Sequence, residues 1–265
     1  MQLTLNKYIN RRLLRALAEF DLINDNDKIM VGLSGGKDSA FILYALKVLQ
    51  KHLSINFSLS AVTVKPIFTK LTKSDRDNIK NFCNDLGIDH FFTEIKSIKN
   101  KLENKENNLS KNPCAYCSHF RRGAIIEIMN KKKFNKLCFG HHRKDVLETF
   151  LLSLFYSGQL ITFPPRRFLP ENNKYIIRPM IYIDEYQIRN KMKKLPYLPL
   201  ENTCPHDGKT KRDKIKIILD KFDDKKQIYN NLFAAIRQSN EDIELWPDKK
   251  NDKLIQKRVA ELWSG

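Results

Sequence analysis

Two groups of residues in this sequence have the types and the spacing to do chemistry. The first is the run SGGKDS at 34–39, which brings two hydroxyls, an ammonium and a carboxylate into one short segment. Glycines adopt backbone conformations that other residues avoid and let a ligand approach the main chain. The ammonium and the hydroxyls add donors for a phosphate. We therefore predict a phosphate-binding loop made of Ser34, Gly35, Gly36, Lys37, Asp38 and Ser39.

The second group consists of cysteines. Cys114 and Cys117 form a CxxC pair at the start of a predicted helix, and Cys204 follows much later in the chain. A helix N-terminus lowers the pKa of nearby thiols, so the pair could supply thiolates that bind a metal or react. The total of five cysteines is odd, which argues against a disulfide framework. We interpret Cys83 and Cys138 as buried small hydrophobic residues.

The elements on either side of the 34–39 loop determine what it can bind. An apolar strand over 29–33 precedes it, and a helical pattern over 40–51 follows it. Unpaired N–H groups at the start of such a helix, together with its dipole, favour an anion. The common P-loop pattern, G-x-x-x-x-G-K-[ST], would need glycine at Val31 and a hydroxyl residue at Asp38. The carboxylate of Asp38 suits magnesium or a polar substrate group better than it suits a bare phosphate. The alternative is a turn that only connects the strand to the helix.

Predicted strands and helices alternate along most of the chain. Apolar segments predict further strands at 57–64, 90–95, 136–140 and 176–180, and helical patterns lie at 72–86, 118–129, 145–156 and 184–195 and from 209 onward. This alternation predicts an α/β fold with a doubly wound, mainly parallel sheet, in which ligands bind beyond the carboxyl ends of the strands. We expect a lid-like loop at 97–112 and a basic loop at 159–174.

We expect three regions along the chain. Residues 1–24 hold an amphipathic basic helix, residues 25–222 form the α/β domain, and residues 223–265 form a helical, polar tail. Apolar side chains in the tail that could dock it on the domain are Phe233, Ile236, Leu245 and Trp246.

The overall charge predicts a polyanionic partner. Lys and Arg total 48 against 30 Asp and Glu, for a formal net charge of +18. Such an excess attracts nucleic acid, although a lysine-rich proteome would produce it too. The cations from Lys209 to Lys216 crowd a helix start, where an anionic partner such as an RNA phosphate would offset their repulsion by the helix dipole. With no apolar run of membrane-spanning length and no cleavable signal, we expect a cytoplasmic protein.

Several motifs together resemble a known family. SGGKDS resembles the PP-loop of enzymes that cleave ATP between the α and β phosphates. With it occur CAYC at 114–117 followed by Arg121-Arg122, GHHRKDVLET at 140–149, FPPRRF at 163–168, IIRPM at 176–180 and Cys204. In this order they resemble the tRNA 2-thiocytidine synthetases, or TtcA-type PP-loop enzymes, over roughly residues 1–222.

The resemblance implies a substrate, cofactors and site residues. By resemblance, Cys114, Cys117 and Cys204 would hold a 4Fe-4S cluster that leaves one iron without a protein ligand. ATP and Mg²⁺ would bind at 34–39 with Gly140, and Lys37, Asp38 and Asp145 would take part in catalysis. The substrate would be a tRNA cytidine at position 32 of the anticodon loop, with a sulfur donor such as a cysteine desulfurase system. A homodimer is implied in the same way.

Two departures and several alternatives remain open. The family's first acid after the paired histidines is Lys144 here, and the second cysteine often found after Cys204 is missing. Asp145 and Glu148 could also serve only the helix dipole. Three thiolates with His206 or His119 could instead close a zinc site. The chain could then be another PP-loop tRNA-modifying enzyme, such as a lysidine-forming ligase or a uridine thiolase, or a zinc-stabilised RNA-binding protein without catalysis.

Overall fold

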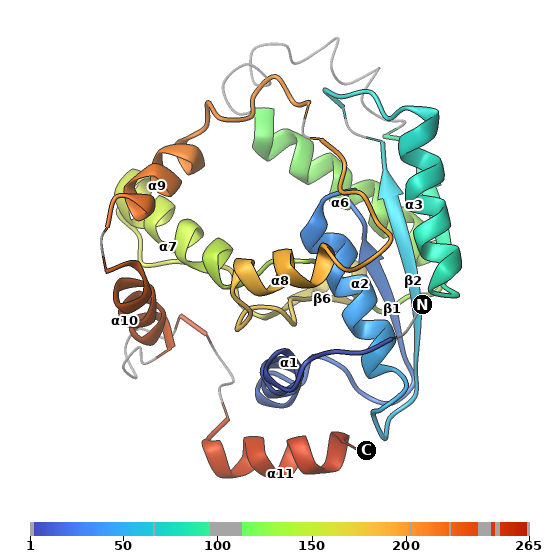
Figure 1. Cartoon of the computed structure of the whole chain (residues 1–265), viewed down its shortest axis with the longest axis horizontal. Helices are drawn as coiled ribbons and strands as arrows, with labels where there is room; N and C mark the ends of the chain where they lie inside the picture. Colours follow the sequence, from blue (N-terminus) through green and yellow to red (C-terminus); the bar gives the residue numbers. More distant parts are fainter. Residues whose placement is uncertain are drawn as a thin grey trace.

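The strands pair into one six-stranded sheet in the computed structural model, in the order β3-β2-β1-β4-β6-β5 (Figure 1). All neighbours are parallel except β5, which pairs antiparallel with β6 at the edge. The predicted mainly parallel α/β fold with a helical C-terminal region is therefore confirmed. The structure describes residues 3–65, 67–95, 113–201, 203–222, 224–237, 245–246 and 250–263. The loop expected at 97–112 lies outside them.

Most elements lie where the sequence pattern predicts them. The strands are β1 (Asp27–Gly32), β2 (Phe57–Val64), β3 (Asp89–Thr93), β4 (Lys136–Cys138), β5 (Arg166–Leu169) and β6 (Lys174–Ile177). The helices are α1 (Lys7–Glu19), α2 (Lys37–Leu49), α3 (Lys73–Asp85), α6 (Pro113–Lys131), α7 (Arg143–Ser157), α8 (Glu185–Met192), α9 (Lys211–Asp220), α10 (Lys225–Arg237) and α11 (Asp252–Leu262). None of these described helices is long and apolar enough to cross a membrane.

Two predicted segments near the edge of the sheet need correction. The segment at 159–174, expected to be a loop, contains strand β5. The sequence does not predict this strand, because Pro165 and Pro170 flank it and its register comes only from pairing with β6. The strand predicted at 176–180 begins and ends earlier, as β6. It stops before Pro179, which has no N–H to donate to a ladder.

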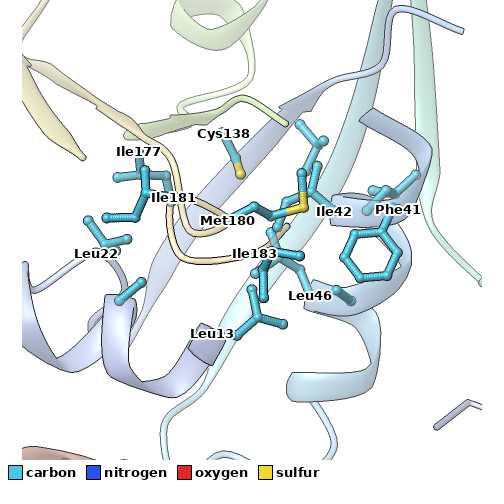
Figure 2. Close-up of a cluster of buried hydrophobic side chains, with 14 of the residues drawn as sticks. Leu13, Leu22, Phe41, Ile42, Leu46, Cys138, Ile177, Met180, Ile181 and Ile183 are labelled. Carbon is cyan, nitrogen blue, oxygen red and sulfur yellow. The ribbon is translucent and has the colours of Figure 1, made fainter. Parts of the chain in front are cut away.

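Helices cover both faces of the sheet. Ile29 and Val31 of β1 belong to the larger core with α1, α2 and α8, whereas Met30 between them belongs to a smaller core with α6. Figure 2 draws part of the larger core, where Cys138 of β4 lies among Ile177 and Met180. Cys83 is also fully buried, so the interpretation of both cysteines as core residues is confirmed.

The C-terminal helices pack on the α/β domain. Phe233, Ile236 and Trp246 are buried in the larger core, as predicted for docking residues. The Trp246 ring lies edge-on to Phe20, with ring centroids 5.6 Å apart. Helix α11 packs against α1 (Figure 1). The C-terminal helices, although largely polar, therefore contact the domain through apolar side chains.

Candidate functional site

The predicted phosphate-binding loop connects β1 to α2 at the carboxyl edge of the sheet. Gly35 has a φ of +91°, and a Cβ at this position would lie 2.5 Å from Leu200 Cδ1. Both facts require glycine. The Gly35 carbonyl accepts hydrogen bonds from the Tyr197 hydroxyl (2.8 Å) and the Leu200 N–H (3.0 Å). The 197–200 segment therefore holds the loop in shape.

The first turn of α2 is suited to an anion. Gly36 is the N-cap and offers no side chain to the N–H groups of that turn. The Ser34 N–H donates to Ser39 Oγ (3.1 Å), and the Ser39 hydroxyl donates to the Gly36 carbonyl (2.9 Å). These bonds keep the two serine hydroxyls 3.1 Å apart. A phosphate here would meet hydroxyl groups and the positive end of a helix dipole.

Gly140 allows the end of β4 to touch α2. A Cβ at this position would lie 2.7 Å from the Asp38 carbonyl oxygen and 3.0 Å from the Ser39 nitrogen. Backbone atoms cannot yield to such a contact unless the helix start moves. Glycine at 140 therefore brings two strand ends and the loop together around one cavity.

A cavity of about 310 Å³ opens at this edge. Apolar lining residues are Val62 and Val64 at the end of β2, Ile125 of α6, and Phe139. Ser34, Asp38, Ser39, Gly140 and Asp145 also line the cavity. A cavity with apolar lining residues beside a helix N-terminus can take an aromatic base at one end and phosphates at the other.

Lys37, Gly35 and Gly36 are not among the residues that line this cavity. Lys37 Nζ lies 2.9 Å from Glu185 Oε1 on α8 and 3.1 Å from Asp38 Oδ2. Burial disfavours the ammonium, but the two carboxylates outweigh this effect and raise the Lys37 pKa. Burial also opposes ionisation of Glu185, but the hydrogen bond and the charge of Lys37, with the nearby His142 and Lys144, together outweigh it and lower the Glu185 pKa to about 2. The loop lysine is thus neutralised by an ion pair in this structure.

Two of the predicted catalytic residues, Asp38 and Asp145, line the cavity. Asp145 is the third residue of α7, where its Oδ2 accepts the His142 N–H at 2.8 Å as part of a capping box. Asp38 Oδ1 is buried and has no hydrogen-bond partner among the described residues. Magnesium prefers carboxylate oxygens combined with substrate phosphates, so this donor set fits Mg²⁺.

The cavity wall also holds cationic side chains that the sequence did not assign to it. Arg121 and Arg122 of α6 and Arg178 occur in motifs of the family resemblance, and all three line the cavity. Arg178 donates to the Pro164 carbonyl at 2.7 Å. Burial, with Arg167 and Arg122 nearby, lowers its pKa to about 10. The position of Arg178 after β6, at the carboxyl edge of a parallel sheet, is the signal that could have identified it.

His141 is a further unassigned residue in this wall. Its Nδ1 is buried without a hydrogen-bond partner among the described residues. Burial, followed by the charge of Arg178, lowers its pKa to about 4. The imidazole is therefore neutral near pH 7.

The three cysteines predicted as ligands line a second cavity, of about 300 Å³. Cys114 and Cys117 lie in the first turn of α6, and Cys204 lies in the segment before α9. The expected lowering of the thiol pKa is wrong for Cys114. Its pKa is raised, first by burial and then by Cys204 and Cys117. His206 lines the same cavity, whereas His119 does not.

The spacing of the donors bears on which metal group fits. In the described part of the chain, no three His, Cys, Asp or Glu side chains lie close enough to hold a single metal ion. A tetrahedral zinc site needs its donors within about 4 Å of one another. The thiolates of an iron–sulfur cluster bind different irons and lie further apart. Three thiols around one cavity are a donor set that an iron–sulfur cluster can use.

The two cavities are neighbours. Ser118 and Arg121 of α6 line both of them. Arg121 Nη2 lies 3.8 Å from Cys117 Sγ, so a residue that contacts the cysteine pair also lines the first cavity. A reaction that activates a group in one cavity and receives sulfur from the other would need this arrangement.

The basic helix start at Lys209–Lys216 carries its own acidic cap, and the RNA contact expected there stays a prediction. Thr210 and Asp213 form a capping box at the start of α9, and Lys216 Nζ lies 3.3 Å from Asp213 Oδ1. Burial acts against ionisation of Asp213, but its hydrogen bonds outweigh burial and lower its pKa. The repulsion from the helix dipole, which motivated an RNA phosphate here, is therefore offset within the chain.

A PP-loop domain model matches residues 5–216. The tRNA-cytidine(32) 2-sulfurtransferase of Hahella chejuensis is 31% identical over 239 residues, which cover 88% of this chain and 81% of that protein. The enzyme of the same name from a Marinomonas species is 34% identical over 83% of this chain and 77% of its own length. The chain belongs to the tRNA-cytidine(32) 2-sulfurtransferase family.

Solved structures agree on the fold of this family member. The U34-tRNA thiolase NcsA of Methanococcus maripaludis, a structure with its [4Fe-4S] cluster, superposes with a TM-score of 0.66 and 21% identity, covering 88% of this chain and 80% of that chain. The NH3-dependent NAD synthetase of Campylobacter jejuni gives a TM-score of 0.51 at 15% identity, over 97% and 95% of the two chains.

The departure at Lys144 has a structural partner. Lys144 Nζ lies 3.6 Å from Asp220 Oδ1 at the end of α9. The side chain is therefore engaged between α7 and α9, and it does not line the nucleotide cavity. In this member of the family the lysine links two helices at the place where the sequence pattern expects an acid.

Proposed function

We propose that this chain is an ATP-dependent tRNA thiolase that replaces the C2 oxygen of a cytidine, at position 32 of the anticodon loop, with sulfur. Family membership supports tRNA as the substrate. The observation that carries the proposal is the lining that the two cavities share, with Arg121 in both linings and in contact with Cys117. Adenylation and sulfur insertion would then occur side by side.

The first step is an adenylation. The cytidine C2 oxygen attacks the α-phosphorus of ATP, forming an O–P bond, and pyrophosphate leaves with the electron pair of the broken P–O bond. Ser34, Ser39 and the start of α2 would bind the phosphates, while Asp38 and Asp145 would hold Mg²⁺. The charge that develops on the departing pyrophosphate would be stabilised by Arg121, Arg122 and Arg178. Lys37 could join them only by leaving Glu185.

The second step puts sulfur in place of the activated oxygen. Cys114, Cys117 and Cys204 would hold a 4Fe-4S cluster, which would supply sulfide for this step. At C2 a C–S bond forms, the C–O bond breaks, and AMP leaves with its electron pair. Arg121 would stabilise negative charge on the incoming sulfur and on the departing phosphate.

The metal content of the protein tests the cofactor. The full chain is purified without oxygen, and iron, acid-labile sulfide, zinc and visible absorption are measured. We expect brown protein with about four irons per chain, colourless protein for Cys204→Ala, and full iron content for Cys83→Ala, which changes a core cysteine. Zinc at one per chain would contradict the cluster and favour a site closed by His206.

Pyrophosphate release separates the remaining alternatives. An adenylating enzyme releases pyrophosphate from ATP only when its tRNA is present, and Asp145→Asn should reduce this rate by about tenfold or more. A non-catalytic RNA-binding protein would release none. A lysidine-forming ligase would release pyrophosphate without any cluster, and a uridine thiolase would yield 2-thiouridine.

The partners follow from the same reaction. Sulfide must be replenished after each turnover, so we propose a persulfide-delivering donor of the cysteine desulfurase class together with a two-electron reductant that converts its sulfane sulfur to sulfide. A homodimer is also proposed, and light scattering on the purified chain would test it.

A further inference from the structure

Arg212 makes contacts that the reaction above does not use. It lies in the first turn of α9, and its Nη2 donates to Thr149 Oγ1 at 2.9 Å. Its Nη1 lies 3.6 Å from Asp145 Oδ1 and 3.6 Å from Glu148 Oε2. One guanidinium therefore holds three side chains near the start of α7.

These contacts join the two cavities. Arg212 lines the cysteine cavity together with Cys204, whereas Asp145 lines the nucleotide cavity. The segment that carries Cys204 leads directly into the helix turn that carries Arg212. A displacement of Asp145 can therefore be transmitted to the segment that carries Cys204 through the side chain of Arg212.

The buried carboxylate of Glu148 explains why a guanidinium is needed here. Glu148 is only 3% exposed and lines neither cavity. Burial and the nearby Asp145 raise its pKa to about 7, and Arg212 acts in the opposite direction. A planar guanidinium can serve two carboxylates and a hydroxyl at once, which the point charge of a lysine cannot do.

We propose that Arg212 is a positioning residue that couples occupation of the nucleotide cavity to the position of Cys204. The inference rests on the proposed function, because it assigns ATP to one cavity and the sulfur-supplying cofactor to the other. Magnesium nucleotide bound at Asp145 fixes that carboxylate. Through Arg212 it then fixes the turn of α9 that follows Cys204.

The coupling is measured as the effect of nucleotide on alkylation of Cys204. The full chain, stripped of metal, is treated with N-ethylmaleimide with and without saturating magnesium ATP, and the peptide containing Cys204 is quantified by mass spectrometry. We expect nucleotide to slow alkylation about fivefold or more in the wild type. In Arg212→Gln the rate should be the same with and without nucleotide, although calorimetry still detects nucleotide binding.

Two further variants complete the test. Lys214→Gln removes the same charge from an exposed position on the same helix and should keep the full nucleotide effect. If Arg212→Gln does not fold, Thr149→Val removes only the hydrogen-bond acceptor and should lose part of the effect.

An equal nucleotide effect in the wild type and Arg212→Gln, or no effect in the wild type, overturns the proposal. Because alkylation does not depend on turnover, the two hypotheses can fail separately. A chain that makes 2-thiocytidine without the nucleotide effect retains the function and loses the coupling. A chain with the effect but without the product retains only the coupling.

Discussion

Glycine residues determine how closely the strand ends and helices around the nucleotide cavity can approach one another. At Gly140 the space that a side chain would need is filled by the backbone of Asp38 and Ser39. The same kind of argument applies at Gly35, where a positive φ and Leu200 both exclude a Cβ. The absence of a Cβ at Gly35 and Gly140 therefore determines the shape of the phosphate end of the cavity.

Gly140→Ala should damage nucleotide binding through this contact. The added methyl must push the first turn of α2 away from β4, so we expect a loss of about 1–3 kcal/mol in stability and weaker ATP binding by calorimetry. Gly123→Ala is the matched control, because a Cβ at this helical position meets nothing within 4 Å. It should stabilise the chain slightly and leave ATP affinity unchanged; equal ATP affinity in Gly140→Ala would contradict the argument.

The Lys37–Glu185 pair predicts a dependence of stability on pH. The pKa of Glu185 is lowered from 4.5 to about 2 in the folded chain. Ionised Glu185 therefore stabilises the fold above about pH 4.5 and loses this contribution as the pH falls towards 2. Melting temperatures measured across this window should fall less for Glu185→Gln than for the wild type. The exposed Glu171→Gln should follow the wild type; an identical slope for Glu185→Gln would refute the role of the pair.

Only some of the residues around the nucleotide cavity could be predicted from the sequence. Ser34, Asp38 and Ser39 could be placed because a strand, a turn and a helix start define where they lie. The pairing of Lys37 with Glu185 could not, because the two residues are distant in sequence and meet only when α8 packs on α2. Arg178 was missed for a similar reason, since its cavity exists only after β6 joins β4.

At the scale of elements, local signals predicted the helices better than the edge of the sheet. The helical pattern over 72–86 predicts α3 within a residue or two, and the structure adds a capping box at Thr72. Strand β5 has no such signal, because its place depends on β6 and its own residues are mainly basic. At α9, the prediction of repulsion by the helix dipole considered only the cations and left out Asp213, which forms the capping box with Thr210.

The C-terminal helices should unfold together with the α/β domain, although the boundary at residue 222 itself stays a prediction. Trp246 packs against Phe20 and Phe233, so Trp246→Ala should cost about 3–5 kcal/mol. Leu254→Ala, on the exposed side of α11, should change stability by less than about 0.5 kcal/mol. Calorimetry should give one transition for the wild type. Two separate transitions, with only one shifted by Trp246→Ala, would contradict this account.

At the scale of the whole molecule, the charge of +18 predicts tRNA binding that weakens with salt. The exposed Arg167 on the edge strand β5 is a candidate phosphate contact. Arg167→Gln should reduce the slope of log affinity against log salt by about one, measured by filter binding. Arg258→Gln removes the same charge from α11, where Arg258 pairs with Glu261, and should leave the slope unchanged. Equal slopes for all three proteins would exclude a phosphate contact at Arg167.

The central claim is that the two adjoining cavities serve one reaction on tRNA, and the modified nucleoside tests it most directly. Anaerobic full-length protein is incubated with unmodified tRNA, magnesium ATP and sulfide. The tRNA is then digested and its nucleosides are identified and mapped by mass spectrometry. We predict 2-thiocytidine at position 32, one AMP for each thiolation, and no product from Cys204→Ala. Release of AMP and pyrophosphate without 2-thiocytidine, or sulfur on a uridine, would contradict the account.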